Sequence, residues 1–335
     1  MKLPERTEAF SRLGKLIKDL TPDELEFIAT RARIENPWFT ADNIRLSLKG
    51  IEILLEEDAL VNWVMKYPEL TASKTVGVAM AGNIPFVGFH DFLCVLISGH
   101  RLKVKLSSQD SVLFGFIFNK LVSIEPKFHE MVSVEERLKD TDAIIATGSD
   151  NTARYFEYYF RNIPHIIRKN RSSCAILMGE ESESDMRDLG LDVFTYFGLG
   201  CRNVSKLYVP EDFDFGKLIR SWEPYRDVVH HHKYANNYDY QKSILLTNLH
   251  PFLDGEFIIL KKETSLVSPI SVLYYEPYRD QADVKSKLNA NSEKLQLIAS
   301  AKGWFDKSVA FGDAQFPKVN EYADNVDTMK FLTGI

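Results

Sequence analysis

One stretch of the chain, residues 75–106, most strongly limits the folds that this sequence can adopt. It begins with alternating apolar residues typical of a strand, continues through an apolar run that ends at Gly99, and closes with a second alternating segment over 102–106. A strand, a helix and a second strand within about thirty residues form a βαβ unit, whose two strands lie parallel in one sheet. The sequence therefore predicts an α/β fold built on a parallel sheet.

Further strands and helices follow along the chain. Apolar residues over 142–147 lead into Gly148 and Ser149, and a helix is expected from about residue 151. More strands are predicted at 174–178, 204–209, 256–261 and 269–275. These two series of elements predict two doubly wound α/β domains, at 73–172 and 173–335, the second including the C-terminal tail.

The first 72 residues are expected to form a helical segment that packs on the domain at 73–172. Thr21 and Glu24 are spaced as a capping box with Pro22 at the first helical position, and a second helix is predicted from Thr40. No residue pattern in this segment indicates chemistry.

The composition is typical of a soluble globular protein that is long enough for two domains. The 335 residues are 45% hydrophobic and 26% charged. A net charge of −6 and a pI near 5.8 argue against binding to the phosphate backbone of nucleic acids. The N-terminus is charged and lacks the apolar core of a signal peptide.

Cysteine usage and hydropathy indicate a cytoplasmic protein. Three cysteines without a C-x-x-C pair predict neither a disulfide framework nor a zinc site, and they fit a reducing cytoplasm. The most apolar stretch, 86–98, contains His90 and Asp91 and is too short to span a bilayer. We therefore expect a buried helix there and no stable membrane insertion.

Cys201 is the candidate nucleophile, because it follows Gly198 and Gly200 and precedes a predicted strand. A cysteine is more often a small buried hydrophobic residue than a catalytic one. Glycines, however, permit close backbone approach, and nearby amides can favour a thiolate and bind an oxyanion. By comparison, Cys94 is expected in the core of an apolar helix and Cys174 in a buried strand.

Gly148 and Ser149 form a second candidate feature, at the start of a predicted helix. Free amides and the positive end of a helix dipole suit a phosphate, whereas a simple N-cap explains the same residues equally well. No G-x-G-x-x-G follows any predicted strand, so the usual dinucleotide fingerprint is missing.

Two other clusters do not indicate a site. Residues 230–232 are three consecutive histidines, but their spacing does not match that of zinc ligands, and we predict no metal site. The aromatic residues in 234–240 fit either core packing or a substrate channel, and the sequence leaves both open.

The landmarks together resemble the aldehyde dehydrogenase superfamily, and within it the fatty acyl-CoA reductase (LuxC-type) family. The matching segments, in order, are 82–85 (GNIP), 99–105 (GHRLKVK) with Ser107 and Ser108, 147–149 (TGS) and 198–201 (GLGC). Segments 36–40 (NPWFT) and 321–331 resemble the acyl-CoA reductase branch in particular. Each motif is short, but their shared order is fairly specific.

The resemblance implies a role for each matching residue. Cys201 matches the nucleophile that attacks a thioester or aldehyde carbonyl, and Asn83 matches the side-chain donor of the oxyanion hole. Lys105 matches the lysine that contacts the adenosine ribose, and 148–149 the turn under the pyrophosphate. Asn83 as an ordinary turn residue is the alternative.

The same resemblance implies a preference for NADPH over NADH. NAD-preferring members carry a glutamate three residues after the lysine, where this chain has Ser108. A carboxylate there repels a 2′-phosphate, whereas serines at 107 and 108 beside Lys105 admit it.

The chain departs from the superfamily pattern in two places. Segment 166–173 has no carboxylate where hydrolytic members carry the glutamate that activates water, and 263–269 lacks the usual glutamate, phenylalanine and glycine before its proline. The chain is also shorter than typical members, so the strands that serve oligomerisation are expected to be reduced or rearranged. A homo-oligomer is one possible state, and the sequence does not decide the oligomeric state.

The implied function is NADPH-dependent reduction of a fatty acyl-CoA to an aldehyde through an acyl-cysteine thioester. The domain at 73–172 would bind NADPH, and that at 173–335 would carry the nucleophile. The alternatives are a CoA-acylating aldehyde dehydrogenase that runs in the oxidative direction, and a non-catalytic nucleotide-binding relative that retains the fold.

Overall fold

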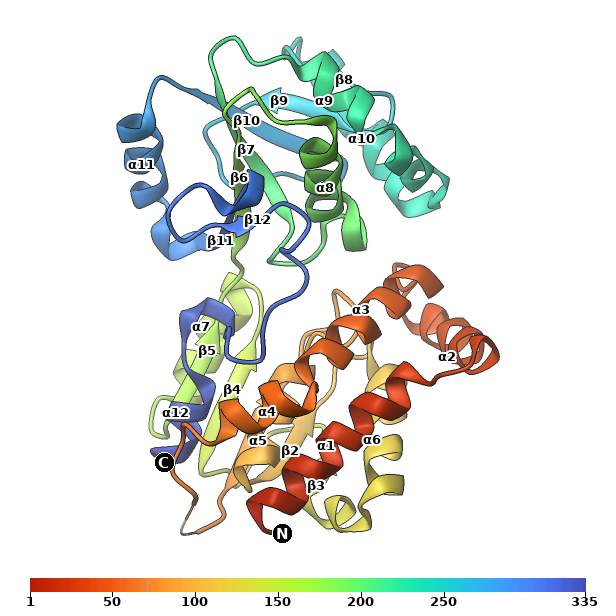
Figure 1. Ribbon diagram of the computed structural model, residues 1–335, viewed down its shortest axis with the longest axis vertical. Helices are drawn as coiled ribbons and strands as arrows, with labels where there is room; N and C mark the ends of the chain where they lie inside the picture. Colours follow the sequence, from red (N-terminus) through yellow and green to blue (C-terminus); the bar gives the residue numbers. More distant parts are fainter. Residues whose placement is uncertain (71) are drawn as a thin grey trace. The chain divides into compact units, whose positions relative to one another are not determined.

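The computed structural model describes residues 1–70 and 72–335. Thr71, next to the expected end of the helical segment at residue 72, lies outside the described residues. The chain divides into two compact units: unit 1 comprises Met1–Asn170 and Phe316–Ile335, and unit 2 comprises Arg171–Gln315. Each unit is built around its own sheet (Figure 1). The predicted α/β class with parallel sheets is confirmed.

Unit 1 contains a five-stranded parallel sheet in the order β3-β2-β1-β4-β5. Its strands are β1 (Thr75–Ala79), β2 (Arg101–Lys105), β3 (Val132–Val134), β4 (Ala143–Thr147) and β5 (His165–Arg168). Its sheet is flanked by helices α5 (Phe89–Ser98), α6 (Ser111–Ile124) and α7 (Asp150–Phe160). The predicted buried helix over 86–98 corresponds to α5, whose residues 93–97 are fully buried.

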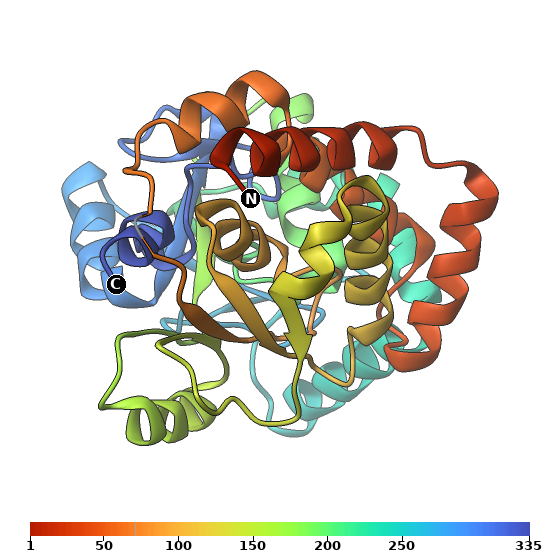
Figure 2. The same cartoon turned by 90° about the horizontal axis from the view of Figure 1, so that it is seen from below.

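The N-terminal segment is helical, as predicted, and packs within unit 1. Its helices are α1 (Leu3–Lys18), α2 (Pro22–Glu35), α3 (Ala41–Leu54) and α4 (Glu57–Val64). The Thr21–Glu24 capping box is confirmed: Thr21 Oγ1 accepts a bond from the Glu24 amide, and the Glu24 carboxylate accepts one from the Thr21 amide. Helix α1 packs against α3, α5 and α6. The N-terminal helices, drawn red to orange in Figure 2, contribute buried side chains to the unit 1 core.

The C-terminal tail belongs to unit 1, although the sequence placed it with 173–335. Buried side chains hold it there, because Tyr322 Oη accepts a hydrogen bond of 2.8 Å from Trp63 Nε1 and His100 Nε2 lies 2.9 Å from the Leu332 carbonyl oxygen. Helix α12 (Thr328–Thr333) packs against α5. These contacts join residues more than 200 positions apart, and no local pattern in the sequence announces them.

Unit 2 contains a seven-stranded sheet in the order β12-β11-β6-β7-β10-β9-β8, in which only the β8–β9 pair is antiparallel among the described pairings. Its strands are β6 (Ser172–Ile176), β7 (Val204–Pro210), β8 (Leu253–Asp254), β9 (Ile259–Lys262), β10 (Val272–Tyr278), β11 (Leu295–Ser300) and β12 (Val309–Ala310). Its helices are α8 (Glu183–Phe194), α9 (Phe215–Ser221), α10 (His232–Thr247) and α11 (Gln281–Ala290). The strands predicted at 256–261 and 269–275 start about three residues later in the structure.

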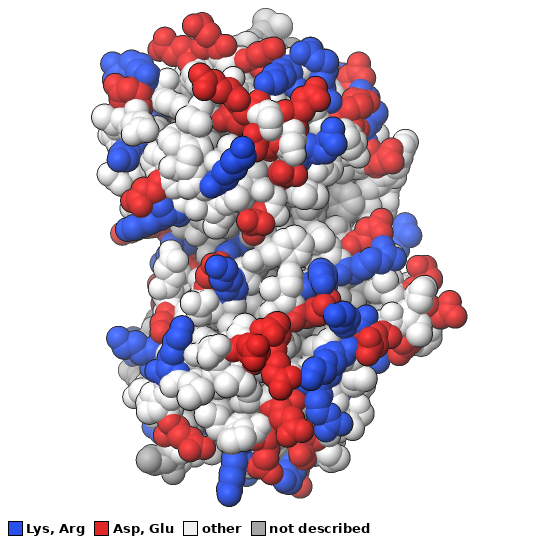
Figure 3. Space-filling view, viewed as in Figure 1, with Lys and Arg blue, Asp and Glu red and all other residues white. Residues whose placement is uncertain are grey.

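Charged side chains of both signs lie next to one another on the face shown in Figure 3. One exposed pair joins Lys15 of α1 to Glu57 of α4 at 2.8 Å. Such exposed pairs contribute little to stability, because water screens them. In residues 1–70 and 72–335, no helix is both long and apolar enough to cross a membrane.

Candidate functional site

The unit 1 sheet has a topological switch point beside β1. The chain leaves β1 through α5 to reach β2 on one side, whereas β4 pairs with β1 on the other side. In open parallel sheets, ligands bind outside the carboxyl ends of the strands at such a point. The loops at this edge carry the residues predicted in unit 1: Asn83 after β1, Lys105, Ser107 and Ser108 at the end of β2, and Gly148 and Ser149 after β4.

Asn83 is exposed in the loop between β1 and α5, and its neighbour Gly82 is buried. The end of this loop is strained, because Phe86 has a φ of 58°, in the left-handed region that a bulky residue rarely adopts. The Phe86 amide donates to Asp110 Oδ2 at 3.1 Å. Burial raises the pKa of Asp110 to about 8. The strained loop is therefore fixed by side chains from outside it.

The β2 loop touches the Asn83 loop directly. A Cβ at Gly82 would lie 2.6 Å from Ser107 Oγ, so only glycine fits at this contact. Ser107 Oγ accepts a hydrogen bond of 3.2 Å from the Gln109 amide. Lys105 and Ser108 are exposed, and no carboxylate occurs between positions 105 and 109. This loop offers a cation and hydroxyl groups at the edge of the sheet.

Gly148 and Ser149 form the turn from β4 into α7. Ser149 caps the helix, since its Oγ accepts a bond of 3.3 Å from the Thr152 amide, as the N-cap interpretation predicts. The Gly148 amide donates to the Arg168 carbonyl oxygen at 3.2 Å. A Cβ at Gly148 would lie 2.9 Å from Thr152 Cβ, so the turn needs glycine. The cap leaves the positive end of the α7 dipole at the switch point, where it suits a phosphate.

Cys201 belongs to unit 2, where it is exposed in the turn that precedes β7. Ser173 Oγ donates a hydrogen bond of 2.9 Å to the Cys201 carbonyl oxygen. Asn203, two residues later and 1% exposed, accepts from the Gly200 amide at 2.8 Å through Oδ1. Its Nδ2 donates to the carbonyl oxygens of Thr195 at 2.8 Å and Asp192 at 3.0 Å. Asn203 thus clamps both ends of the segment before the cysteine.

The clamped segment has an unusual backbone. Tyr196, Phe197 and Gly198 have φ angles of 52°, 57° and 77°, so two residues other than glycine adopt the left-handed conformation. This conformation costs roughly 1–2 kcal/mol for each such residue. The Phe197 ring lies 4.4 Å from the His231 ring and 6.1 Å from the Tyr234 ring, which anchors the segment to α10 and its N-cap.

The residue after Cys201 is tied to a second loop of unit 2. Arg202 Nε donates to the Ala314 carbonyl oxygen at 2.7 Å. The buried Asp192 carboxylate accepts from the Gly312 and Ala314 amides at 2.8 and 3.1 Å, and burial raises its pKa to about 7. Asn203 and Asp192 were not identified from the sequence. For Asn203 the available signal was a polar residue just before an apolar strand, whereas Asp192 lies within α8 and had no such signal.

The other two thiols are unsuited to nucleophilic chemistry. Cys94 and Cys174 are buried, as predicted. Burial raises the pKa of Cys94 well above its ordinary value and that of Cys174 to about 12. Since the thiolate is the reactive form, neither group reacts readily near neutral pH.

The histidines and aromatic residues over 230–240 fall into two groups. His231, Tyr234 and Tyr238 pack against other side chains, whereas the exposed ones are His230, His232 and Tyr240. The His231 ring is tilted against the Phe197 ring, and Tyr234 is buried and donates to the Phe257 carbonyl oxygen at 2.9 Å. Tyr238 is buried as well, so core packing accounts for Tyr234 and Tyr238. Outside Thr71, the chain has no group of three or more His, Cys, Asp or Glu side chains placed to hold a metal ion.

Arg168, in the segment that lacks the superfamily's carboxylate, is committed to structure. Its guanidinium forms a buried ion pair with Asp91 and donates to Thr328 Oγ1 at 2.9 Å, all within unit 1. Removing one partner of such a buried pair costs about 3–5 kcal/mol.

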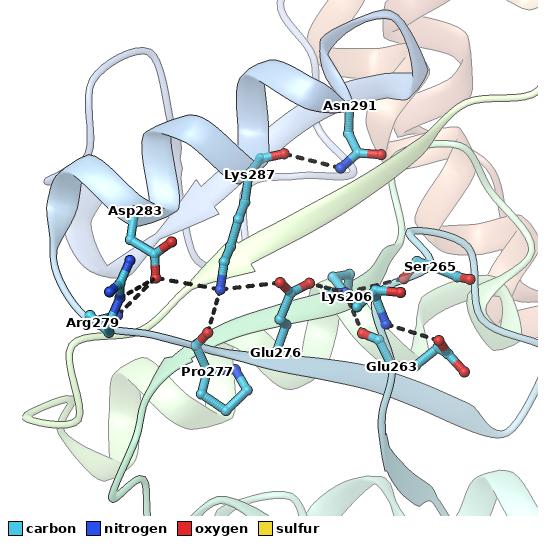
Figure 4. Close-up of polar contacts among 10 residues, drawn as sticks. Lys206, Glu263, Ser265, Glu276, Pro277, Arg279, Asp283, Lys287 and Asn291 are labelled. Carbon is cyan, nitrogen blue, oxygen red and sulfur yellow. Dashed lines mark hydrogen bonds and ion pairs between the residues drawn. The ribbon is translucent and has the colours of Figure 1, made fainter.

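Segment 263–269, which differs from the superfamily pattern, is fixed by contacts with Lys206 (Figure 4). The Lys206 side chain is completely buried. Its ammonium donates to the carbonyl oxygens of Glu263 and Ser265 and pairs with Glu276 at 2.8 Å. Burial lowers the pKa of Lys206, and Glu276 opposes that shift. Lys287 also contacts Glu276, at 3.1 Å, so the carboxylate is shared by two cations. The Glu263 carboxylate pairs with Lys261 of the preceding strand β9 at 2.9 Å.

No family model matches this sequence, and no curated protein matches it either. Solved structures do. A mutant form of an aldehyde dehydrogenase from Bacillus cereus aligns with a TM-score of 0.70 at 12% identity, over 99% of this chain and 82% of that one. Aldehyde dehydrogenase 21 from Physcomitrella patens, in complex with succinate, aligns at 0.67 and 12% identity over 100% and 84%.

A third similar structure is an NAD-dependent benzaldehyde dehydrogenase from Corynebacterium glutamicum. It aligns with a TM-score of 0.68 at 12% identity, over 90% of this chain and 76% of that one. Likeness at this level of identity establishes the fold, which is that of the aldehyde dehydrogenases.

Proposed function

Starting from an aldehyde dehydrogenase fold, we propose that the protein is an NAD(P)-dependent oxidoreductase that reduces a fatty acyl-CoA to an aldehyde. The observation that carries this proposal is Cys201. It is the exposed one of the three thiols, and it lies in a turn that Asn203 and a strained backbone hold in one conformation. An ordered, exposed thiol that follows glycines suits a nucleophile.

The edge of the unit 1 sheet fits a dinucleotide. A Cβ at Gly82 would clash with Ser107 and one at Gly148 with Thr152, so both turns are closely packed. Exposed Lys105 and the dipole of α7 supply positive charge at the carboxyl ends of β2 and β4. Bound NADPH would supply a hydride to the carbonyl carbon of the acyl-cysteine. Lys105, Ser107 and Ser108 would bind its adenosine end, and the turn at 148–149 its pyrophosphate.

The chain's own groups would act in sequence on the acyl group. The Cys201 thiolate attacks the thioester carbonyl of acyl-CoA, the carbon–sulfur bond to CoA breaks, and the CoA thiolate leaves. The Cys201 amide would donate to the oxyanion in both addition steps, and the resemblance of segment 82–85 gives Asn83 the role of the side-chain donor. After hydride addition and protonation, the carbon–sulfur bond to Cys201 breaks and releases the aldehyde. Acyl-CoA, NADPH and a proton thus give aldehyde, CoA and NADP⁺.

Reduction rather than hydrolysis is supported by the segment around β5. It contains no carboxylate that could activate water, and Arg168 within it is buried in an ion pair. The reverse reaction, oxidation of an aldehyde to acyl-CoA, would use the same residues. An exposed nucleophilic thiol also requires a reducing compartment, which supports the cytoplasm.

The test is covalent labelling. Incubation with a radiolabelled long-chain acyl-CoA should label the protein, and Cys201→Ala should abolish the label. If the variant is labelled as well as the parent, or if Cys94 or Cys174 carries the acyl group, the assignment is wrong. A parent that binds nucleotide but is never acylated would instead support the non-catalytic alternative.

A further inference from the structure

The loop that carries Asn83 is held by three side chains from other elements of unit 1. Asn36 Nδ2 donates to the Gly82 carbonyl oxygen at 2.9 Å, and Ser47 Oγ donates to the Pro85 carbonyl oxygen at 2.8 Å. The third contact is the Phe86 amide bond to Asp110. Asn36 ends α2 and Ser47 lies in α3, so two of the anchors come from the helical N-terminal segment.

Asn36 is built to hold one orientation. It is 3% exposed, and its Oδ1 accepts from the Trp38 amide at 3.1 Å while Nδ2 reaches Gly82. The Trp38 amide requires an acceptor and the Gly82 carbonyl requires a donor, so the side-chain amide can face only one way. The Asn36 backbone amide donates to the Ala32 carbonyl oxygen at 2.9 Å, which fixes the residue to the end of α2.

The bond to Gly82 controls the residue next to it. The Gly82 carbonyl belongs to the peptide plane that leads into Asn83, so a donor that fixes this carbonyl also sets the direction from which the Asn83 side chain leaves the backbone. The Gly82 backbone is also packed closely against the Ser107 side chain. The plane is thus held by a hydrogen bond from one element and by close packing from another.

We propose that Asn36 is a positioning residue for Asn83, and that the α2–α3 turn is therefore part of the catalytic apparatus. The proposal deepens the function proposed above and rests on the role given there to Asn83. Ser47 acts in the same way at the other end of the loop. A misplacement of about 1 Å in a catalytic group can reduce a rate about 10²-fold, so a rigid support for this loop has a large effect on the chemistry.

The test uses a substitution that separates the local turn from the bond to Gly82. Asn36→Ser retains a short hydroxyl that can accept from the Trp38 amide, but it is too short to reach Gly82. The matched control is Asn43→Ser in the first turn of α3, because Asn43 Nδ2 donates to the Trp38 carbonyl oxygen rather than to Gly82. Ser47→Ala is the second variant, and it should fold because alanine is the best helix former.

The readout is the rate at which acyl-CoA acylates Cys201, combined with a double-mutant cycle. We expect Asn36→Ser to slow acylation about 10- to 100-fold, Ser47→Ala to slow it less, and Asn43→Ser to leave it within about twofold. In an Asn83→Ala background, Asn36→Ser should have no further effect, because the group that it positions is gone. Independent, multiplying effects of the two substitutions, or an unchanged rate in Asn36→Ser, would overturn the proposal.

Hydrogen exchange of the peptide over residues 81–90 gives a second readout that does not depend on activity. It should be faster in Asn36→Ser than in the parent and in Asn43→Ser. Equal exchange in all three proteins would overturn the positioning role. If the parent is never acylated but exchange responds as expected, the proposed function fails while the structural support of the loop stands.

Discussion

Replacing Asn203 by alanine removes the clamp on the cysteine turn. The substitution deletes the hydrogen bonds to the Gly200 amide and to the Thr195 and Asp192 carbonyl oxygens. At about 1 kcal/mol for each of these bonds, the expected loss in unfolding free energy is about 3 kcal/mol. Relaxation of the left-handed residues 196 and 197 returns part of that energy, since each costs roughly 1–2 kcal/mol in the parent. We therefore expect a net loss of about 1–3 kcal/mol and a disordered turn.

Two measurements on the full chain test this expectation. Urea unfolding gives the loss in stability, and the alkylation rate of Cys201 by iodoacetamide, followed by peptide mass spectrometry, reports on the turn. Cys94 and Cys174 are buried and should stay unmodified in the native state. The control is Asn237→Ala in α10, where Nδ2 donates to the Lys233 carbonyl oxygen one turn earlier and alanine favours the helix. Its stability should be unchanged or slightly higher.

The result that refutes the reasoning is equally definite. If Asn203→Ala unfolds within about 0.5 kcal/mol of the control and Cys201 is alkylated at the parental rate, Asn203 does not hold the turn. A loss of stability with an unchanged alkylation rate would show that the clamp stabilises unit 2 without ordering the nucleophile.

The remaining predictions concern the cofactor, the acyl-enzyme and the effect of pH. NADPH should bind more tightly than NADH, and Lys105→Ala should weaken NADPH binding more than NADH binding, because a charge-assisted contact to phosphate contributes about 1.5–3 kcal/mol. Equal affinities of the parent for the two nucleotides in a fluorescence titration would contradict this. Acyl-Cys201 should accumulate without NADPH and give aldehyde when NADPH is added, because general-base assistance to hydrolysis, typically about 10²–10⁴-fold, is missing. Rapid release of free fatty acid, detected by mass spectrometry, would reveal an unidentified base. Burial lowers the pKa of His100 below its usual 6.5, and its Nδ1 accepts from the Lys74 amide, so the folded state favours the neutral ring. As the pH falls through 6.5, the unfolded chain binds a proton at His100 before the folded chain does, which lowers the stability of the parent. The difference in unfolding free energy between the parent and His100→Gln, measured by urea unfolding, should therefore shrink between pH 7 and 5. A constant difference would contradict the assignment.

The sequence by itself determined the class of the fold and several local features. Strand and helix periodicity depends on residues a few positions apart, so the βαβ unit at 75–106 and the Thr21–Glu24 capping box could be read directly. The carboxyl ends of parallel strands share one edge of a sheet. The predicted residues of unit 1 therefore had to lie together once β1, β2 and β4 were neighbours.

The tertiary structure alone decided how the loops are held. The bond from Asn36 to Gly82 joins positions 46 apart, and the tail that ends in α12 packs on α5 although the sequence placed it with unit 2. Asn203 was overlooked because an asparagine before a strand is also an ordinary turn residue, and only its burial distinguishes it. Phe197 adopts a left-handed backbone that its residue type disfavours. Contacts with distant groups outweigh a local preference of roughly 1–2 kcal/mol, and a linear pattern does not contain those contacts.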